Sequence, residues 1–352
     1  VRRVGDGVRP EREFRVALCG YYGFGNLGDE LLAEALIAAL ERCGIKRGEM
    51  AMLSASPEES ARAHGVCSVS RWSPRAVFRI LRRSETFLLG GGGLFQDVTS
   101  LRSPLYYWGA LRLALLAGAR PWCAGQSVGP LLTKRGRLLA RSALGSCSVR
   151  GVRDARSAEL LADWGMNSVV TCDPVFSLTP PVTSPRHGSA LLVNIRPWTG
   201  GLASKTAEES ARLASSRSLS LTGFALAAED AGIMEELRRS GVFPAERIVL
   251  LDAENWRSEC GRLFPEADGV VAMRFHASLL ALLFGRPLTA VAYDPKVESL
   301  ASEWSLPSWS GSGALPEPAA PLGPFRPFEK GAEFLKTFSE MCAAAMRRDG
   351  KE

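Results

Sequence analysis

Three side chains able to bind anions or move protons stand among apolar runs in the second half of the chain: Arg274, His276 and Lys296. The runs "GVVAMR" and "PLTAVAY" predict buried strands, and helices are expected to begin at His276 and at "DPKVESL". Because neighbouring parallel strands end at the same edge of a sheet, we expect the three side chains to face one ligand. Cations beside helix N-termini favour an anion, and an imidazole exchanges protons near neutral pH. The pattern predicts an anion site with acid–base chemistry.

A glycine-rich turn, "GYYGFGNLGDE" at residues 20–30, follows the first apolar run and opens a helix. Its G-x-G-x-x-G spacing is a weak sign of dinucleotide binding, because the next strand ends in "LSAS" and offers no acid for a ribose. The backbone N–H groups of such a turn favour an anion or a polar sugar. Asn26 and Asp29 are its chemical groups; a turn former and a favourable charge in the first helical turn are their alternative roles.

Two further strand ends carry glycine and polar side chains. "LLGGGGLFQD" places Gly91, Gly92 and Gly93 directly after a buried strand, where a tight turn would let the main chain reach a substrate. "AGQSVGPL" places Gln126 at the end of the next strand. A purely structural turn is the alternative for the glycines.

Arginines follow the next strand, in "SVRGVRDARSAELL". A guanidinium at the carboxyl end of a strand suits a carboxylate or a phosphate, which it binds through two parallel hydrogen bonds. Either Arg150 or Arg153 fits this role. The alternative is a surface pair of Arg153 with Asp154 or of Arg156 with Glu159.

Buried runs alternate with helical patterns along the whole chain, which predicts an α/β protein with parallel sheets. The expected strands are 15–22, 49–55, 86–91, 121–129, 146–151 and 168–172, then 190–195, 219–226, 247–252, 269–274 and 287–293. The expected helices are 28–44, 73–83, 103–118, 134–145, 154–164, 205–216, 229–239, 254–264 and 277–284. We predict two Rossmann-like domains, 14–175 and 190–320, with a linker at 176–189 and a terminal helix at 328–348. They resemble the glycosyltransferase-B architecture, in which the two domains face a cleft.

Composition limits the class of partner. The chain has 352 residues, 46% of them hydrophobic, and a net charge of +6 that favours anionic partners. Basic and aromatic residues are not interleaved, so nucleic acid is not expected. The eight cysteines are at least 24 residues apart, which predicts neither a zinc site nor a disulfide framework and favours the cytoplasm. "WGALRLALLAGA" is too short to span a bilayer, so any membrane contact is expected to be peripheral.

Taken together, "GYYGFGNLGDE", "LLGGGGLFQD", "GQSVGPL", "VRDARSAELL", "CDPVF", "MRFHA" and "YDPKV" resemble the polysaccharide pyruvyl transferase family. The resemblance is closest to bacterial cell-wall polysaccharide pyruvyl transferases of the CsaB type. It implies transfer of pyruvate from phosphoenolpyruvate to a sugar, with a cyclic ketal formed and phosphate released. The implied acceptor is a β-linked N-acetylmannosamine of a lipid-linked precursor. Its acidic ketal would be recognised by surface-layer homology domains.

The resemblance, together with the residues, implies roles at the site. His276 is expected to be the general acid, or else a proton relay that contacts the phosphate, and Asp29 is a candidate base. Arg153, Arg274 and Lys296 are expected to bind the donor. Asn26, Gly91, Gly92, Gly93 and Gln126 are expected to border the acceptor. Neither a metal nor a cofactor is expected, because phosphoenolpyruvate is a co-substrate.

Two other functions are compatible with the same elements. A nucleotide-sugar glycosyltransferase of the same fold would use the cations of the second domain for a diphosphate. A sugar- or anion-binding protein would use them for binding alone.

Overall fold

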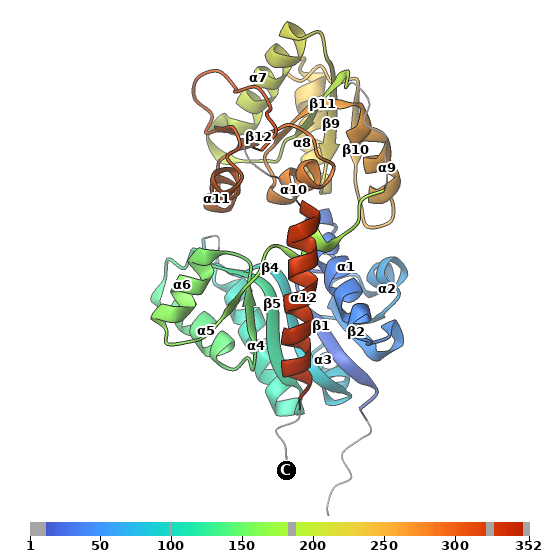
Figure 1. The fold of residues 1–352 in the computed structure, drawn as a ribbon, viewed down its shortest axis with the longest axis vertical. Coiled ribbons are helices and arrows are strands. Elements are labelled where there is room, and N and C mark those ends of the chain that lie inside the picture. Colours follow the sequence, from blue (N-terminus) through green and yellow to red (C-terminus); the bar gives the residue numbers. More distant parts are fainter. Residues whose placement is uncertain (1–11, 99, 182–187, 322–326, 348–352) are drawn as a thin grey trace, which may run out of the picture. The chain divides into compact units, whose positions relative to one another are not determined.

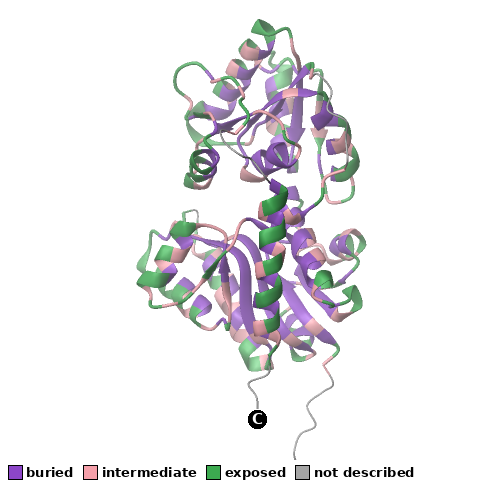
Figure 2. Cartoon of the chain, in the orientation of Figure 1, coloured by how far each residue is buried: buried purple, intermediate pink, exposed green. Residues whose placement is uncertain are grey.

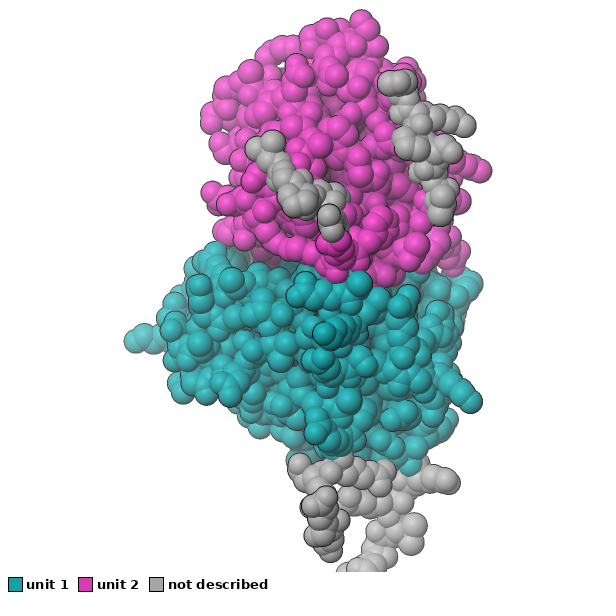
Figure 3. Space-filling view, viewed as in Figure 1, with its two compact units in different colours: residues 1–24, 32–174, 332–352 teal, residues 25–31, 175–331 magenta. Residues whose placement is uncertain are grey.

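The computed structural model describes residues 12–98, 100–181, 188–321 and 327–347. The chain divides into two compact units, coloured separately in Figure 3. Unit 1 comprises Val1–Phe24, Leu32–Pro174 and Ala332–Glu352; unit 2 comprises Gly25–Leu31 and Val175–Gly331. The terminal helix therefore groups with unit 1 from Ala332 onward, and the glycine-rich turn groups with unit 2 from Gly25 to Leu31.

Unit 1 is built on a seven-stranded parallel sheet in the order β3-β2-β1-β4-β5-β6-β7. Its strands are β1 (Phe14–Cys19), β2 (Met50–Ser54), β3 (Cys67–Ser70), β4 (Ser84–Phe95), β5 (Arg120–Val128), β6 (Arg150–Val152) and β7 (Val169–Val170). These strands are predominantly buried, apart from the edge strands β3 and β7 (Figure 2).

Helices cover both faces of this sheet (Figure 1). The apolar side chains of α3 (Pro74–Arg82), α4 (Arg102–Ala117), α5 (Lys134–Gly145) and α6 (Ala155–Asp163) pack in one core. Those of α1 (Leu27–Arg42) and α12 (Pro327–Met346) pack in the other. A further helix, α2 (Pro57–His64), joins β2 to β3.

Unit 2 holds a six-stranded parallel sheet in the order β10-β9-β8-β11-β12-β13. Its strands are β8 (Ala190–Asn194), β9 (Ser220–Ala225), β10 (Arg247–Leu250), β11 (Ala267–Ala272), β12 (Leu288–Val291) and β13 (Ser308–Trp309). Its helices are α7 (Leu202–Ser216), α8 (Ala228–Arg239), α9 (Trp256–Leu263), α10 (Phe275–Leu283) and α11 (Pro295–Glu303).

The predicted α/β class with two parallel sheets is confirmed, and each expected strand and helix has an observed counterpart. The sequence did not predict α2, β3 or β13. The strand β3 reads "CSVS" and is at best half-buried at an edge, so it lacks the apolar run that identifies a buried strand. Residues 182–187 of the expected linker and residue 348 of the expected terminal helix lie outside the described residues.

The glycine run differs from its prediction as a turn, because β4 continues through it to Phe95. A Cβ atom on Gly90 would lie 2.2 Å from the Tyr22 hydroxyl, and one on Gly91 would lie 2.8 Å from Leu32 Cδ2. Gly91 and Gly92 also have positive φ, +34° and +87°. The structure therefore explains Gly90 and Gly91 by the close packing of neighbouring side chains.

Candidate functional site at the sheet edges

The predicted positions of His276 and Lys296 are confirmed. His276 is the second residue of α10, which follows β11, and Lys296 is the second residue of α11, which follows β12. The two strands are hydrogen-bonded neighbours. Asp294 caps α11 by accepting a hydrogen bond from the Lys296 amide at 2.8 Å. An imidazole and an ammonium thus sit at the first turns of helices that leave adjacent strands.

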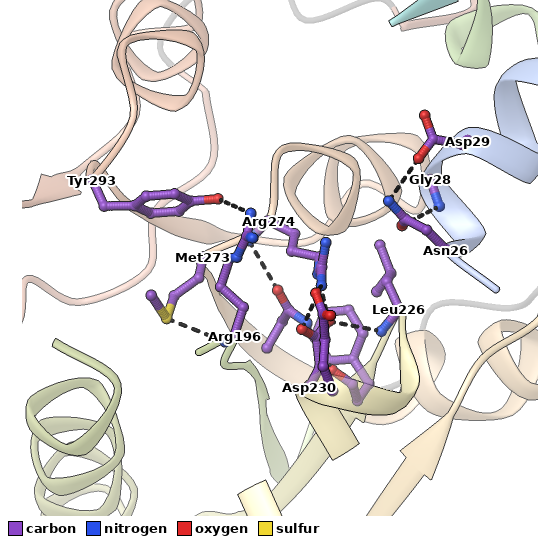
Figure 4. Close-up of polar contacts among 12 residues, drawn as sticks. Asn26, Gly28, Asp29, Arg196, Leu226, Asp230, Met273, Arg274 and Tyr293 are labelled. Carbon is purple, nitrogen blue, oxygen red and sulfur yellow. Dashed lines mark hydrogen bonds and ion pairs between the residues drawn. The ribbon is translucent and has the colours of Figure 1, made fainter. Parts of the chain in front are cut away.

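Arg274 is not the exposed cation that the sequence predicted. Its guanidinium is 2.5 Å and 2.7 Å from the two carboxylate oxygens of Asp230 (Figure 4). It also lies 2.6 Å from a Glu229 oxygen. Its residue is only 9% exposed and Asp230 is fully buried. Because a buried guanidinium is costly without a partner, these carboxylates are what allow it there. The positive charge of Arg274 is therefore paired with Asp230 and Glu229. Arg274 holds the backbone just before His276 in place.

The imidazole of His276 lies against the first turn of α1. A Cβ atom on Gly28 would lie 2.3 Å from His276 Nδ1 and 2.8 Å from Cγ. The same turn is held by a hydrogen bond from the Leu27 amide to the Leu226 carbonyl, at 2.8 Å. Only a residue without a side chain leaves room for the ring here, so Gly28 positions the imidazole.

Asn26 and Asp29 belong to this turn and to unit 2. The Asn26 side-chain oxygen accepts from the Gly28 amide at 3.2 Å, and its amide nitrogen donates to Asp29 Oδ2 at 2.6 Å (Figure 4). Both residues are half-buried. The alternative role of Asn26 as a turn former is therefore observed, since its side chain accepts from the backbone two residues on. Asp29 shares one turn with Gly28, the glycine that contacts His276.

A further cation, Arg196, was missed from the sequence. It follows β8, the strand beside β11, and its Nη1 donates to the Tyr293 hydroxyl at 3.1 Å. Its guanidinium also lies over the rings of Trp198 and Tyr293, at 5.4 Å and 5.6 Å from their centroids. Burial raises the pKa of Tyr293, an effect that the charge of Arg196 opposes. Among the described residues no carboxylate lies within 4.0 Å of this guanidinium.

The sequence signal for Arg196 was available. An arginine directly after the buried run "ALLVNI" has the same kind of position as Arg153, at the carboxyl end of a strand.

Arg150 and Arg153 both have partners within unit 1. Arg153 Nη1 lies 2.5 Å from Asp173 Oδ2, and both side chains are buried. The Asp154 carboxylate instead caps α6, accepting from the Ser157 amide at 2.7 Å. Arg150 donates to the Leu144 carbonyl at 2.7 Å. The surface pair of Arg153 with Asp154 is therefore not formed, and the Arg153 charge is balanced by a buried carboxylate.

Gln126 differs from its prediction as an acceptor ligand. Its side chain is fully buried, and its amide donates to the Leu89 carbonyl at 3.3 Å, joining β5 to β4. Within the glycine run, Gly91 and Gly92 are buried and Gly93 is half-buried. Of these four residues, Gly93 alone is partly accessible.

Exposed aromatic rings at the edge of unit 1 were also missed. Arg71 donates to the Gly20 carbonyl at 2.8 Å, and its guanidinium carbon lies 4.1 Å from the ring centroid of Tyr106, 5.0 Å from Phe24 and 5.4 Å from Trp72. Phe24 stacks on Tyr21 at 3.9 Å. We call these five residues the Arg71 cluster.

The Arg71 cluster presents aromatic faces to solvent. Trp72 is 61% exposed, Tyr21 42% and Phe24 37%. Tyr21 and Trp72 follow the strands β1 and β3, so the cluster stands at the carboxyl edge of the sheet. Exposed rings that gather around one cation are typical of a binding surface.

Comparison with known proteins identifies the family. The polysaccharide pyruvyl transferase family matches residues 26–295, and the chain belongs to that family, as the sequence resemblance implied. It is therefore a transferase enzyme. Among curated proteins none matches this chain.

Solved structures share the fold at low sequence identity. The UDP-GlcNAc 2-epimerase of Methanocaldococcus jannaschii, solved with UDP-GlcNAc and UDP, has a TM-score of 0.60 and 8% identity, covering 93% of this chain and 100% of the epimerase. A UDP-N-acetylglucosamine 2-epimerase from Listeria monocytogenes, so named provisionally, has a TM-score of 0.57 and 10% identity over 95% of this chain and 91% of its own. Staphylococcus aureus MnaA with UDP has a TM-score of 0.54 and 11% identity over 93% and 98%. These likenesses support the glycosyltransferase-B-like fold.

No described helix combines the length and hydropathy needed to cross a bilayer. Across the same residues, His, Cys, Asp and Glu side chains form no group of three or more that could hold a metal ion. The expectation that no cofactor is used stays a prediction.

Proposed function

We propose that the enzyme transfers pyruvate from phosphoenolpyruvate to two hydroxyls of a sugar, forming a cyclic ketal and releasing phosphate. The family match gives the class of reaction. The observation that carries the proposal is the seating of His276: at the first turn of α10, against Gly28, beside the strand that leads to Lys296. This arrangement supports acid–base chemistry next to an anion.

The donor needs positive charge, because phosphoenolpyruvate carries a carboxylate and a phosphate close together. We assign these contacts to Lys296 and Arg196, which follow β12 and β8 in the sheet of unit 2. The N-termini of α10 and α11 add favourable dipoles. Arg274 is assigned a positioning role, because its charge is engaged by Asp230 and Glu229. Arg153 would bind the donor only by exchanging Asp173 for one of its anionic groups.

The chemistry assigned to His276 is protonation of the donor's methylene carbon. That step turns the enol carbon into an oxocarbenium-like centre, which the first sugar hydroxyl attacks. Cleavage of the carbon–oxygen bond to phosphate then allows the second hydroxyl to close the ketal. The two hydroxyl protons balance the reaction, since one replaces the proton given to the methyl group and the other leaves on phosphate. Asp29 is our candidate base for a hydroxyl proton.

For the acceptor we propose a β-N-acetylmannosamine residue of a lipid-linked cell-wall precursor. The Arg71 cluster supports a sugar, because the apolar face of a pyranose stacks on exposed aromatic rings. Asn26 and Gly93 remain our candidates for polar contacts with the acceptor. The acidic ketal product would serve to anchor surface-layer proteins.

The test is incubation with phosphoenolpyruvate and a water-soluble β-N-acetylmannosamine glycoside. We expect phosphate release that depends on the glycoside, and a pyruvate ketal visible by mass spectrometry and NMR. Turnover of a nucleotide sugar, with no phosphate released from phosphoenolpyruvate, would instead identify a glycosyltransferase and reject the proposal.

A further inference from the structure

One segment of unit 1 has a highly asymmetric charge. Residues 98–153 contain nine Lys or Arg residues and no Asp or Glu, although the whole chain carries 37 acidic residues in 352. At that density about six acidic residues would fall in the segment. The segment forms α4, β5, α5 and β6. Its positive charge is therefore not offset by carboxylates of its own.

Part of this charge lies on one face of α5 together with an exposed leucine. Lys134, Arg135, Leu138 and Arg141 are all exposed, and their spacing places them on one side of a helix. Leu138 is 67% exposed. The neighbouring helix α4 adds Arg102 and Leu105, both exposed, at its first turn.

Two loops at the carboxyl edge of the sheet expose further apolar side chains to solvent. Val98 follows β4 and is 55% exposed; Leu132 follows β5 and is 70% exposed. Asp97 ties the two loops together, accepting from the Leu132 amide at 2.5 Å and from the Thr133 amide at 2.9 Å. Burial alone would raise the pKa of Asp97, but these bonds and one from the Thr133 hydroxyl outweigh it and lower the pKa. The exposure of Val98 and Leu132 is thus fixed by an ordered polar contact.

We propose that this surface docks onto an anionic lipid bilayer. We call it the leucine–arginine face and define it by its apolar and its basic members. The apolar members are Val98, Leu105, Leu132 and Leu138; the basic members are Arg102, Lys134, Arg135 and Arg141. Cations near an anionic leaflet are attracted to it, and interspersed leucines enter the headgroup region.

The composition of the face favours lipid over other macromolecules. The face has none of the aromatic side chains in which protein interfaces are enriched, and protruding leucines gain nothing from a nucleic-acid backbone. The inference deepens the proposed function, because a lipid-linked acceptor would present its sugar at a bilayer surface. The loops bearing Val98 and Leu132 end the same strands, β4 and β5, that carry the glycine run and Gln126.

The experiment is co-sedimentation of the full chain with vesicles of phosphatidylcholine, with and without phosphatidylglycerol. We expect binding to the anionic vesicles alone, weakening as salt is raised. Replacing Lys134, Arg135 and Arg141 together by Gln should lower the partition coefficient by roughly 100-fold, since each charge near the surface contributes about fivefold. Leu132→Asp with Leu138→Asp should lower it by tenfold or more.

Matched controls test whether position matters. Leu116 is 77% exposed at the opposite end of α4, so Leu116→Asp should leave vesicle binding unchanged. The same holds for Arg238, Arg239 and Arg257 of unit 2, exposed cations whose joint replacement by Gln removes an equal charge.

Three results would overturn the inference: equal binding to neutral vesicles, equal losses in the controls, or tighter binding of an oligonucleotide than of anionic vesicles. Phosphate release with a water-soluble acceptor separates this inference from the proposed function. The face variants should keep that activity. Vesicle binding without phosphate release would contradict only the proposed function. Phosphate release without vesicle binding would contradict only the proposed membrane docking.

Discussion

The imidazole of His276 contacts the backbone of Gly28, so closely that a Cβ atom on Gly28 would lie 2.3 Å from Nδ1. The ring is thereby held between the first turn of α10, to which it belongs, and the first turn of α1. Asp29, our candidate base, is the next residue along the chain. One glycine therefore fixes the ring and adjoins the residue proposed to work with it.

Gly28→Ala is expected to displace the imidazole, because the new methyl group would also lie 2.8 Å from Cγ and 3.1 Å from Cβ of His276. These atoms are near the base of the side chain, so a small rotation does not relieve the clash. We expect kcat to fall by at least tenfold, measured as phosphate release, with the donor KM less affected. Gly232→Ala in α8 is the control, since a Cβ there meets nothing within 4 Å; it should keep full activity. Wild-type kcat in Gly28→Ala would contradict the positioning role.

His276→Ala is expected to lower kcat by about 10²–10⁴-fold, the usual contribution of a proton donor. Binding of phosphoenolpyruvate, measured by calorimetry, should weaken much less, because Lys296 and Arg196 remain. If turnover survives the substitution, His276 is not the acid, and a protein that only binds its ligand becomes the better description.

Arg274 and Lys296 should respond differently to loss of charge. Arg274→Gln leaves the buried carboxylate of Asp230 without its guanidinium and should lower the free energy of unfolding by about 3–5 kcal/mol. Lys296→Gln, at a half-buried position, should change it by about 1 kcal/mol or less and raise the donor KM by about tenfold or more. Urea unfolding and steady-state kinetics measure the two effects. An Arg274 variant of native stability with a raised donor KM would restore the original sequence prediction.

Trp72→Ala should weaken binding of the acceptor and leave binding of the donor unchanged. One stacking ring contributes about 1 kcal/mol to the free energy of binding, so its loss should raise the acceptor KM about fivefold. Phe328→Ala removes another exposed ring, 59% accessible and outside the Arg71 cluster, and should have no effect. An unchanged acceptor KM in Trp72→Ala would remove the cluster from the acceptor site.

Cys43 is expected to react with iodoacetamide at neutral pH. A hydrogen bond from the Cys342 thiol, aided by one from Ser339 and opposed by partial burial, lowers the pKa of Cys43 to about 7. The alkylation rate should therefore reach half its maximum near pH 7, where an ordinary thiol with a pKa of 9.0 would still be largely protonated. Cys342→Ala removes the donor and should move this midpoint upward.

The alkylation needs two controls. Cys342→Ser keeps a donor and should largely preserve the low midpoint, and a Cys67→Ser background removes an exposed competing thiol. A midpoint that is the same in Cys342→Ala as in the parent protein would show that the thiol pair does not set the pKa.

The sequence by itself determined the two parallel sheets and the placement of His276 and Lys296 at helix starts on adjacent strands. Both follow from local patterns, since buried runs alternate with amphipathic ones and helices start where apolar periodicity resumes. The same local logic placed Arg274 at a strand end but said nothing of its partner. Local sequence patterns could not predict that Asp230, on α8, would pair with it.

Only the tertiary structure decided which of these side chains are paired or buried, and which residues contact them. Arg274 is neutralised by carboxylates from another helix, and Gln126 is buried between strands. Gly28 meets an imidazole from the other half of the chain. The rings around Arg71 come from two strand-to-helix connections and from α4. The physical reason is common to all: chain pattern fixes where a side chain leaves its element, whereas charge pairing and burial depend on residues that folding brings from far away.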